Sequence, residues 1–151
     1  MEQGVIEDPV MKQRLEFQPS EDGTAVLVKM WVEPGGGVPP HVHPSMEERF
    51  TVLSGQPSFL SGRRWQTAAP GDTVVVPAGV RHAYRNRGDE LAHVVCQASP
   101  AMSLQEFLEE AAAMARAGKM TRHGLPKSPG ALVQALGLAL RHRKMVVMRP
   151  V

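Results

Sequence analysis

Hydrophobic and polar residues alternate over several short stretches in the first two thirds of the chain, which is the pattern of half-buried β-strands. In residues 24–33, Val26, Val28 and Val32 fall on one side and Lys29 on the other, so we expect the valine side in the core. The other expected strands are residues 11–17, a hairpin over 59–65, and residues 73–76, 82–86 and 91–98. About eight strands without an intervening helix predict a sandwich or a closed barrel.

After Pro100 the hydrophobic period lengthens to between three and four residues, as in amphipathic helices. Ser103 followed by Glu106 predicts a capping box at the start of a first helix, which Gly118 ends. Ser128 followed by a proline predicts the start of a second helix. The apolar stripe expected on this second helix comprises Leu132, Val133, Leu136, Ala139 and Leu140.

Together these patterns predict a mostly β protein with a small antiparallel β-barrel over residues 1–100 and a two-helix C-terminal extension over residues 101–151. We expect the extension to pack on the barrel or on a second subunit, because its apolar stripes would otherwise lie in water. The edges of the barrel sheets also need to be covered. The sequence therefore favours a homodimer in which the extension is not an independent domain.

Composition narrows the possible partners. With 151 residues, of which 42% are hydrophobic, the chain suits one compact domain, and its net charge of +2 with scattered basic residues does not favour nucleic acid. No apolar run is long enough to span a bilayer, so we expect no membrane partner and a cytoplasmic location. Cys96 is the only cysteine, which excludes an internal disulfide and a zinc site made of cysteines. A metal ion would need histidine and carboxylate ligands.

Two of the six histidines, His41 and His43, lie one residue apart, and on an extended chain their side chains point to the same side. On an unbroken strand Glu47 would share that face but would lie about 13 Å from His43, too far to share an ion with ligand distances near 2 Å. Pro44 is expected to bend the chain between them. Beyond the bend Glu48 falls on the apolar face, which makes it the better candidate ligand.

A third histidine follows the turn signal of Pro77 and Gly79. Alternation along the next expected strand places His82 and Tyr84 on its inner face. Tyr84 either donates a hydrogen bond to a bound molecule or packs in the core, and the sequence leaves both interpretations open. Asn86 is expected to fix the turn after this strand.

Two ordered motifs contain these residues. The first has the fixed positions Gly35, His41, His43, Glu48 and Gly55, and the second has Gly71, Pro77, Gly79, His82 and Asn86. At every fixed position their spacing resembles the two motifs of the cupin superfamily. The fifteen residues between the motifs are similar to the short spacer of small bacterial single-domain cupins.

The resemblance implies a jelly-roll barrel, also described as a double-stranded β-helix, with one divalent metal ion in its mouth. The implied ligands are His41, His43, Glu48 and His82, and this donor set suits iron, manganese, nickel, zinc or copper. Tyr84 is the candidate catalytic residue.

From such a site we expect a small-molecule metalloenzyme. A dioxygenase acting on an aromatic or enol-type substrate is the first choice, and an isomerase or lyase is the second. The alternative is a non-catalytic protein that binds or senses a small ligand through the metal, and fold alone cannot separate these functions.

Overall fold

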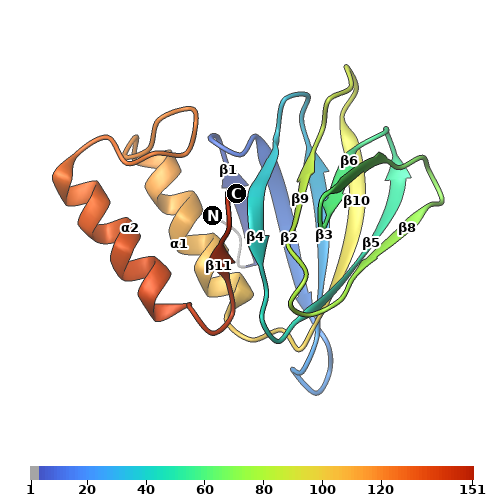
Figure 1. The fold of residues 1–151 in the computed structure, drawn as a ribbon, viewed down its shortest axis with the longest axis horizontal. Coiled ribbons are helices and arrows are strands. Elements are labelled where there is room, and N and C mark those ends of the chain that lie inside the picture. The colour runs from blue at the N-terminus through green and yellow to red at the C-terminus, as the bar shows by residue number, and fades with distance from the viewer. Residues whose placement is uncertain (1–3) are drawn as a thin grey trace.

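The computed structural model describes residues 4–151 as two antiparallel β-sheets that face each other, with two helices beside them (Figure 1). The first sheet has the strand order β1 (Val5–Asp8), β2 (Gln13–Pro19), β3 (Val26–Val32), β10 (Ala92–Ser99), β5 (Glu47–Ser54) and β8 (Thr73–Val76). The second has the order β11 (Val147–Met148), β4 (Gly37–Val42), β9 (His82–Arg85), β6 (Ser58–Ser61) and β7 (Arg64–Thr67). The predicted mostly β jelly roll with C-terminal helices is confirmed.

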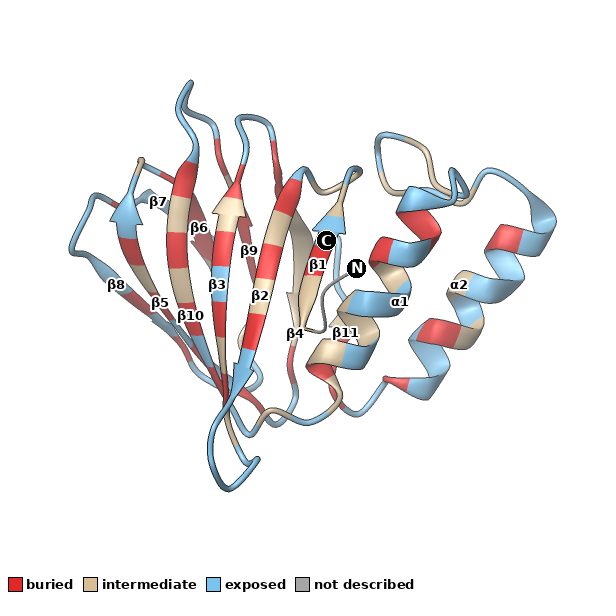
Figure 2. Ribbon diagram, turned by 180° about the vertical axis from the view of Figure 1, so that it is seen from behind, coloured by how far each residue is buried: buried red, intermediate tan, exposed pale blue. Residues whose placement is uncertain are grey.

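The core lies between the two sheets, as the alternating burial along β3 shows (Figure 2). Val26, Val28 and Val32 are at most 3% exposed, whereas Lys29 points to solvent. Strand β3 pairs with β2 on one side and with β10 on the other, so β-branched side chains meet across a pleated surface. The valine face predicted from the sequence is therefore the core face.

Strands β1 and β4 add to those that the alternation predicted. In β4, Pro39 and Pro40 supply no amide hydrogens, and the pairing with β9 is irregular between Val38 and His41. A strand of this composition carries no clear period-two signal. This irregularity matters for the site, because the pairing of β4 with β9 resumes beyond it with His41 directly opposite His82.

The two helices are α1 (Leu104–Arg116) and α2 (Pro129–Arg141). Both begin where the sequence predicted, and α1 ends just before Gly118, as expected. In both views α1 lies beside the sheets and α2 lies outermost (Figures 1 and 2). The predicted capping box is wrong: Ser103 stands at the N-cap, but its hydroxyl makes no cap bond and lies 2.7 Å from His142 Nδ1. At α2, Ser128 Oγ accepts the Ala131 N–H at 3.0 Å, as expected of an N-cap.

The face of α2 that packs differs from the predicted stripe. Ala131 and Leu138 are 4% and 6% exposed, whereas Leu136 is 56% exposed and Val133 is 70% exposed. Apolar residues occur on more than one side of this helix, and the side with the smaller residues lies inward. A row of leucine and valine side chains therefore faces outward in the single chain.

The chain returns to the barrel after α2. Strand β11 pairs with β4, and the Arg81 side chain donates to the carbonyl oxygens of Arg149 and Pro150 at 2.7 and 2.9 Å. The C-terminal end of the chain thus joins the sheet that carries His41. Within residues 4–151, neither helix has the length and apolar character needed to cross a membrane.

Candidate metal centre

Strands β4 and β9 bring two of the candidate ligands together. His41 lies opposite His82 in the antiparallel pairing, and their ring centroids are 4.2 Å apart. The turn before β9 is tied to the segment after β4, because the Gly79 N–H donates to the His43 carbonyl at 2.9 Å. Gly79 has a φ of +83°, a conformation that favours glycine. The motif glycine therefore positions His82 beside both earlier histidines.

Strand β5 supplies the carboxylate. Glu48 is 7% exposed and shares the inner face with Phe50 and Val52, whereas Glu47 is exposed, with its Oε1 3.9 Å from Arg49 Nη2. The prediction that the chain bends and turns Glu48 inward is confirmed.

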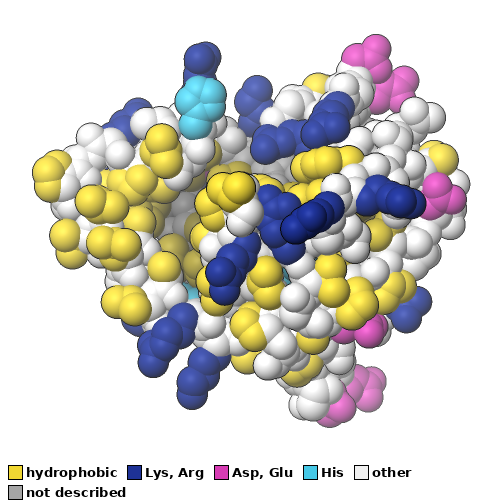
Figure 3. Space-filling view, viewed as in Figure 1, with side chains coloured by type: hydrophobic (Ala, Val, Ile, Leu, Met, Phe, Trp, Pro, Cys, Tyr) yellow, Lys and Arg dark blue, Asp and Glu magenta, His cyan; other side chains and the backbone are white. Residues whose placement is uncertain are grey.

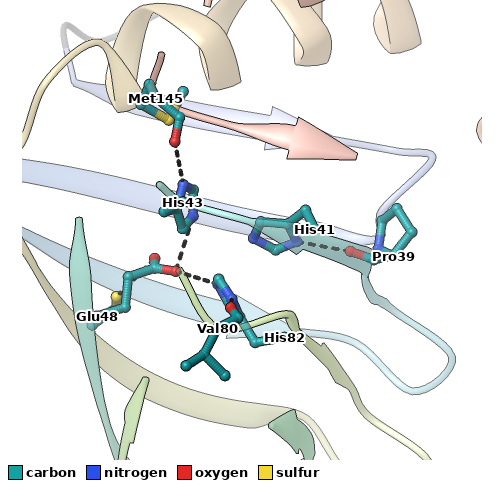
Figure 4. Close-up of polar contacts among 8 residues, drawn as sticks. Pro39, His41, His43, Glu48, Val80, His82 and Met145 are labelled. Carbon is teal, nitrogen blue, oxygen red and sulfur yellow. Dashed lines mark hydrogen bonds and ion pairs between the residues drawn. The ribbon is translucent and has the colours of Figure 1, made fainter. Parts of the chain in front are cut away.

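The three imidazole rings are oriented by backbone carbonyls (Figure 4). Each Nδ1 lies at hydrogen-bond distance from a carbonyl oxygen: His41 from Pro39 at 2.8 Å, His43 from Met145 at 2.8 Å and His82 from Val80 at 2.9 Å. A carbonyl can only accept, so each Nδ1 carries the hydrogen. In a neutral ring Nε2 is then unprotonated, which is the form that binds a metal ion.

The Nε2 atoms converge with the carboxylate. Glu48 Oε1 lies 2.7 Å from His82 Nε2 and 3.0 Å from His43 Nε2, and the candidate ligand atoms of all four residues lie within 4.8 Å of one another. Ligand bonds of about 2 Å place neighbouring donor atoms about 3 to 4 Å apart around an ion. The donor set and its spacing thus fit a divalent metal ion, and His41, His43, Glu48 and His82 form a buried group able to bind one.

Burial and the close approach of these groups set their charges. Burial, together with the neighbouring His82 and His43, lowers the pKa of His41 to about 4, so its ring is neutral at pH 7. Burial alone would raise the pKa of Glu48, but hydrogen bonds from His43 and His82 lower it overall, so the carboxylate is ionised. Burial lowers the pKa of His43, but the hydrogen bond to Glu48 and the negative charge of that carboxylate raise it by more, so the pKa of His43 is raised overall. A metal ion entering here would displace the proton that His43 and Glu48 share.

A cavity of about 170 Å³ is lined by three of the four residues, His41, His43 and Glu48. Tyr84 lines it, as the alternation predicted, but its hydroxyl donates a hydrogen bond to Gln13 Oε1. The Tyr84 ring lies 6.0 Å from that of Phe50, so it also packs in the core. Asn86 is fully buried and donates to the carbonyls of Val32 and Glu90, which confirms that it fixes the turn after β9.

Three contributors to the site were not predicted. The Cys96 thiol donates to Glu48 Oε2 at 3.5 Å, and the inward alternation of β10 could have indicated it. Gln13, the partner of Tyr84, is 6% exposed on β2, again at an inward position. The contact between the Met145 carbonyl and His43 could not be predicted from the sequence, because every residue has a backbone carbonyl.

The other histidines lie outside this group. The His93 ring stacks on Trp31 with centroids 4.5 Å apart, and its Nδ1 is 2.9 Å from the Met30 carbonyl. His142 is 8% exposed and contacts Ser103, so it joins the end of α2 to the start of α1.

Comparison with known proteins relates the strands that carry the site to a described family. The family description "Cupin domain" matches residues 28–97. The rhicadhesin receptor of Pisum sativum is 40% identical over an alignment of 67 residues that covers 41% of this chain and 31% of that protein. Germin-like protein 5-1 of Oryza sativa subsp. japonica is 37% identical over an alignment of 67 residues that covers 41% of this chain and 30% of that protein. The chain thus spans about a third of the length of these curated relatives.

Solved structures share the fold. A recombinant oxalate oxidase in complex with glycolate has a TM-score of 0.52 and 20% identity, covering 59% of this chain and 51% of that chain. A sugar phosphate isomerase of the cupin superfamily from Silicibacter pomeroyi has a TM-score of 0.55 and 22% identity, covering 60% of this chain and 61% of that chain. At these identities the likeness shows the fold alone.

Proposed function

Because the chain belongs to the cupin superfamily, as its match over residues 28–97 and its fold show, we propose that it is a metal-dependent enzyme acting on a small molecule. One divalent ion is held by His41, His43, Glu48 and His82. The observation that carries this proposal is that three Nδ1 atoms are bonded to carbonyls while three Nε2 atoms and a carboxylate face one point.

The candidate ligands are already oriented and buried in the protein without an ion. The backbone carbonyls fix the ring orientations, and the burial of His43, Glu48 and His82 keeps water away from the donor atoms. Three nitrogen donors and one oxygen donor suit iron, manganese, nickel, copper or zinc. When bound, the ion would supply Lewis acidity and, if redox-active, electron transfer to dioxygen.

We place an oxygen-dependent reaction of the dioxygenase type ahead of isomerisation or elimination, because proton transfer in those reactions needs a general base. Besides Glu48, the cavity lining includes one carboxyl among residues 4–151, that of Asp8. Its Oδ1 accepts the backbone N–H groups of Val10 and Met11, both at 2.9 Å, and burial raises its pKa. A carboxyl engaged in this way is better explained as a turn residue than as a base.

The second candidate is a non-catalytic binder in which the ion anchors a ligand. The hydrogen bond between Tyr84 and Gln13 favours it, because this bond engages the hydroxyl that would otherwise act on a substrate. A catalytic role for Tyr84 requires that the substrate replace Gln13 as its partner. Tyr84→Phe should then slow turnover by about tenfold to a hundredfold, and should leave it unchanged if Tyr84 only packs.

Oxygen uptake tests the proposal. Protein loaded with ferrous ion is supplied with one-ring diols and 1,3-dicarbonyl compounds in an oxygen electrode, after its metal content has been measured. We expect uptake with one class of compound, loss of uptake in His82→Ala, and uptake within about threefold of the wild type in Asp8→Asn. Turnover that needs Asp8 but no oxygen would favour an isomerase. Tight binding of a compound that stays unchanged would favour the binder.

Three further expectations stay proposals. The division into a barrel over residues 1–100 and an extension over 101–151 is supported by the position of α1 and α2 outside the two sheets, although β11 returns to the barrel. A homodimer is supported by the outward-facing apolar side chains of α2. The cytoplasmic location rests on the sequence, and cell fractionation with an antibody would test it.

A further inference from the structure

The cavity lined by His41, His43 and Glu48 is small. Its volume of about 170 Å³ is close to that of an engineered cavity of about 150 Å³ that binds benzene. A molecule of about one ring, or a short chain of comparable size, would fill it. Because the cavity touches His41, His43 and Glu48, such a molecule could reach an ion held at those residues.

One wall of the cavity comes from outside the residues that match the cupin description. The barrel contributes Leu15, Val28, Met30, Val38 and Phe50, among others. The C-terminal extension contributes Leu104, Phe107, Leu108 and Ala111 of α1, with Val146 and Met148 after α2. Helix α1 contacts β1 at the edge of the first sheet and lies beside the sheets (Figure 2). The extension therefore shapes the space in which a ligand would lie.

The charged residues that line the cavity also restrict which ligands it can bind. No lysine or arginine lines the cavity in the described part of the chain, whereas Asp8 and Glu48 do. A carboxylate or phosphate on a ligand, away from the ion, would be buried without a cation and close to other anions.

Arginines do occur nearby, but they line an adjoining cleft that shares residues such as Asp8, Phe107 and Met148 with the inner cavity. Arg85, Arg122 and Arg143 line a wider cleft of about 470 Å³ between α1, α2 and β11. A one-ring molecule bound at the metal site would occupy the inner cavity, whose remaining walls are almost entirely aliphatic and aromatic.

We infer, on the basis of the proposed metal site, that the substrate is an uncharged, mainly apolar molecule of about one ring with a single chelating group, and that α1 selects it. This substrate class differs from those named for two structural neighbours, oxalate and a sugar phosphate, which are anions. A sugar phosphate would place a charged group away from the metal, where this cavity offers no lysine or arginine.

Two ligands with the same chelating group test the inference. 4-Methylcatechol and 3,4-dihydroxybenzoate share a ring and a diol and differ by a methyl group against a carboxylate of similar size. Both are titrated by calorimetry, without oxygen, into protein whose bound metal has been quantified. We expect 4-methylcatechol to bind at least about tenfold more tightly, because the carboxylate would be buried unpaired. Oxalate should also bind more weakly than 4-methylcatechol.

A filled cavity tests the role of α1. Leu108→Trp should weaken 4-methylcatechol binding by at least about tenfold without lowering metal content, since the added indole would occupy ligand space. Leu53→Trp, at a residue 50% exposed on β5 and outside the cavity lining, is the matched control and should bind as the wild type does.

The outcomes separate this inference from the proposed function. A protein that takes up no metal would overturn the proposed function and this inference with it. A metal-loaded protein that binds 3,4-dihydroxybenzoate or oxalate as tightly as 4-methylcatechol would overturn the inference alone. Unchanged 4-methylcatechol affinity in a folded Leu108→Trp variant would contradict selection by α1.

Discussion

Among single residues, Glu48 has the largest influence on the metal site. Its carboxylate is buried, contacts His43 and His82 directly, and receives the Cys96 thiol on its other oxygen. An ionised group at this depth is stable because cationic or metal partners surround it. The adjacent Glu47 has the same chemistry but lies in solvent, so the pair provides an internal comparison.

We expect Glu48→Gln to lower metal affinity by more than the roughly 10- to 100-fold that accompanies loss of an outer hydrogen-bond partner of a ligand. The amide keeps the size of the side chain but removes the charge. Glu47→Gln should retain one metal ion per chain. Elemental analysis of both variants, purified side by side, gives the measurement, and equal loss in the two would show that Glu48 is not a ligand.

The lowered pKa of His41 gives a pH dependence in the metal-free protein. The unfolded chain binds a proton at this residue below about pH 6.5, whereas the folded chain does so only near pH 4. Because the unfolded state binds more protons in this window, His41 makes the protein less stable as the pH falls from 6.5 to 4. Melting temperatures of the wild type and of His41→Gln at pH 7 and pH 5 should show the larger decrease in the wild type. Parallel decreases would contradict the assignment.

Side-chain spacing allowed the candidate ligands to be predicted, since His41, His43, Glu48 and His82 are defined by residue type and strand alternation. The backbone partners of their rings were not predictable. A carbonyl belongs to every residue, so only the tertiary structure shows which one faces an imidazole. Tyr84 lies between these cases: its inward direction was predicted, but its bond to Gln13 joins two strands whose pairing partners the sequence did not specify.

Among the elements, the segment after α2 has the clearest link to the site. Met145 is 1% exposed, its carbonyl accepts from His43, and β11 begins two residues later and pairs with β4. The sequence predicted both helices here because capping and period are local signals. It did not predict β11 or the inward face of α2, because a two-residue strand has no period and an alanine-rich face can pack as well as a leucine-rich one.

Removal of residues 144–151 tests this link. The truncated protein loses the Met145 carbonyl and β11, so we expect metal affinity to fall by about 10- to 100-fold, as for other outer partners of ligand histidines. Removal of residues 149–151 alone leaves both features and is the control. Circular dichroism establishes that each protein is folded, and metal titration gives the affinity. Equal affinities in the two truncated proteins would show that this carbonyl is not needed.

At the scale of the whole molecule, one surface stands out. Hydrophobic side chains gather over α2, at the end of the molecule farthest from β8 (Figure 3). Four of them, Leu132, Val133, Leu136 and Leu140, are between 49% and 70% exposed. Exposed apolar side chains in one contiguous row are typical of surfaces that associate. The proposed homodimer would use this row.

We therefore expect Leu136→Glu to convert a dimer to a monomer, because a carboxylate buried between two such faces would lack a partner. Leu53→Glu, at a residue 50% exposed on β5, is the matched control. Size-exclusion chromatography with light scattering measures the mass of each. A wild type that is monomeric at all concentrations, or a Leu136→Glu variant that remains dimeric, would exclude this interface.

The hydrogen bond between His43 and Met145 also implies an order in which the parts of the candidate metal site form during synthesis. The two residues are separated by 102 positions, so the ribosome completes every strand from β5 to β10 before it adds the residue that orients this imidazole. Domains fold as units while the chain is still being made, and the nascent barrel can gather its four candidate ligands first. During that interval His43 is free to rotate and to exchange tautomers. We therefore expect metal captured by the nascent chain to exchange readily, and to be retained only after translation has passed Met145.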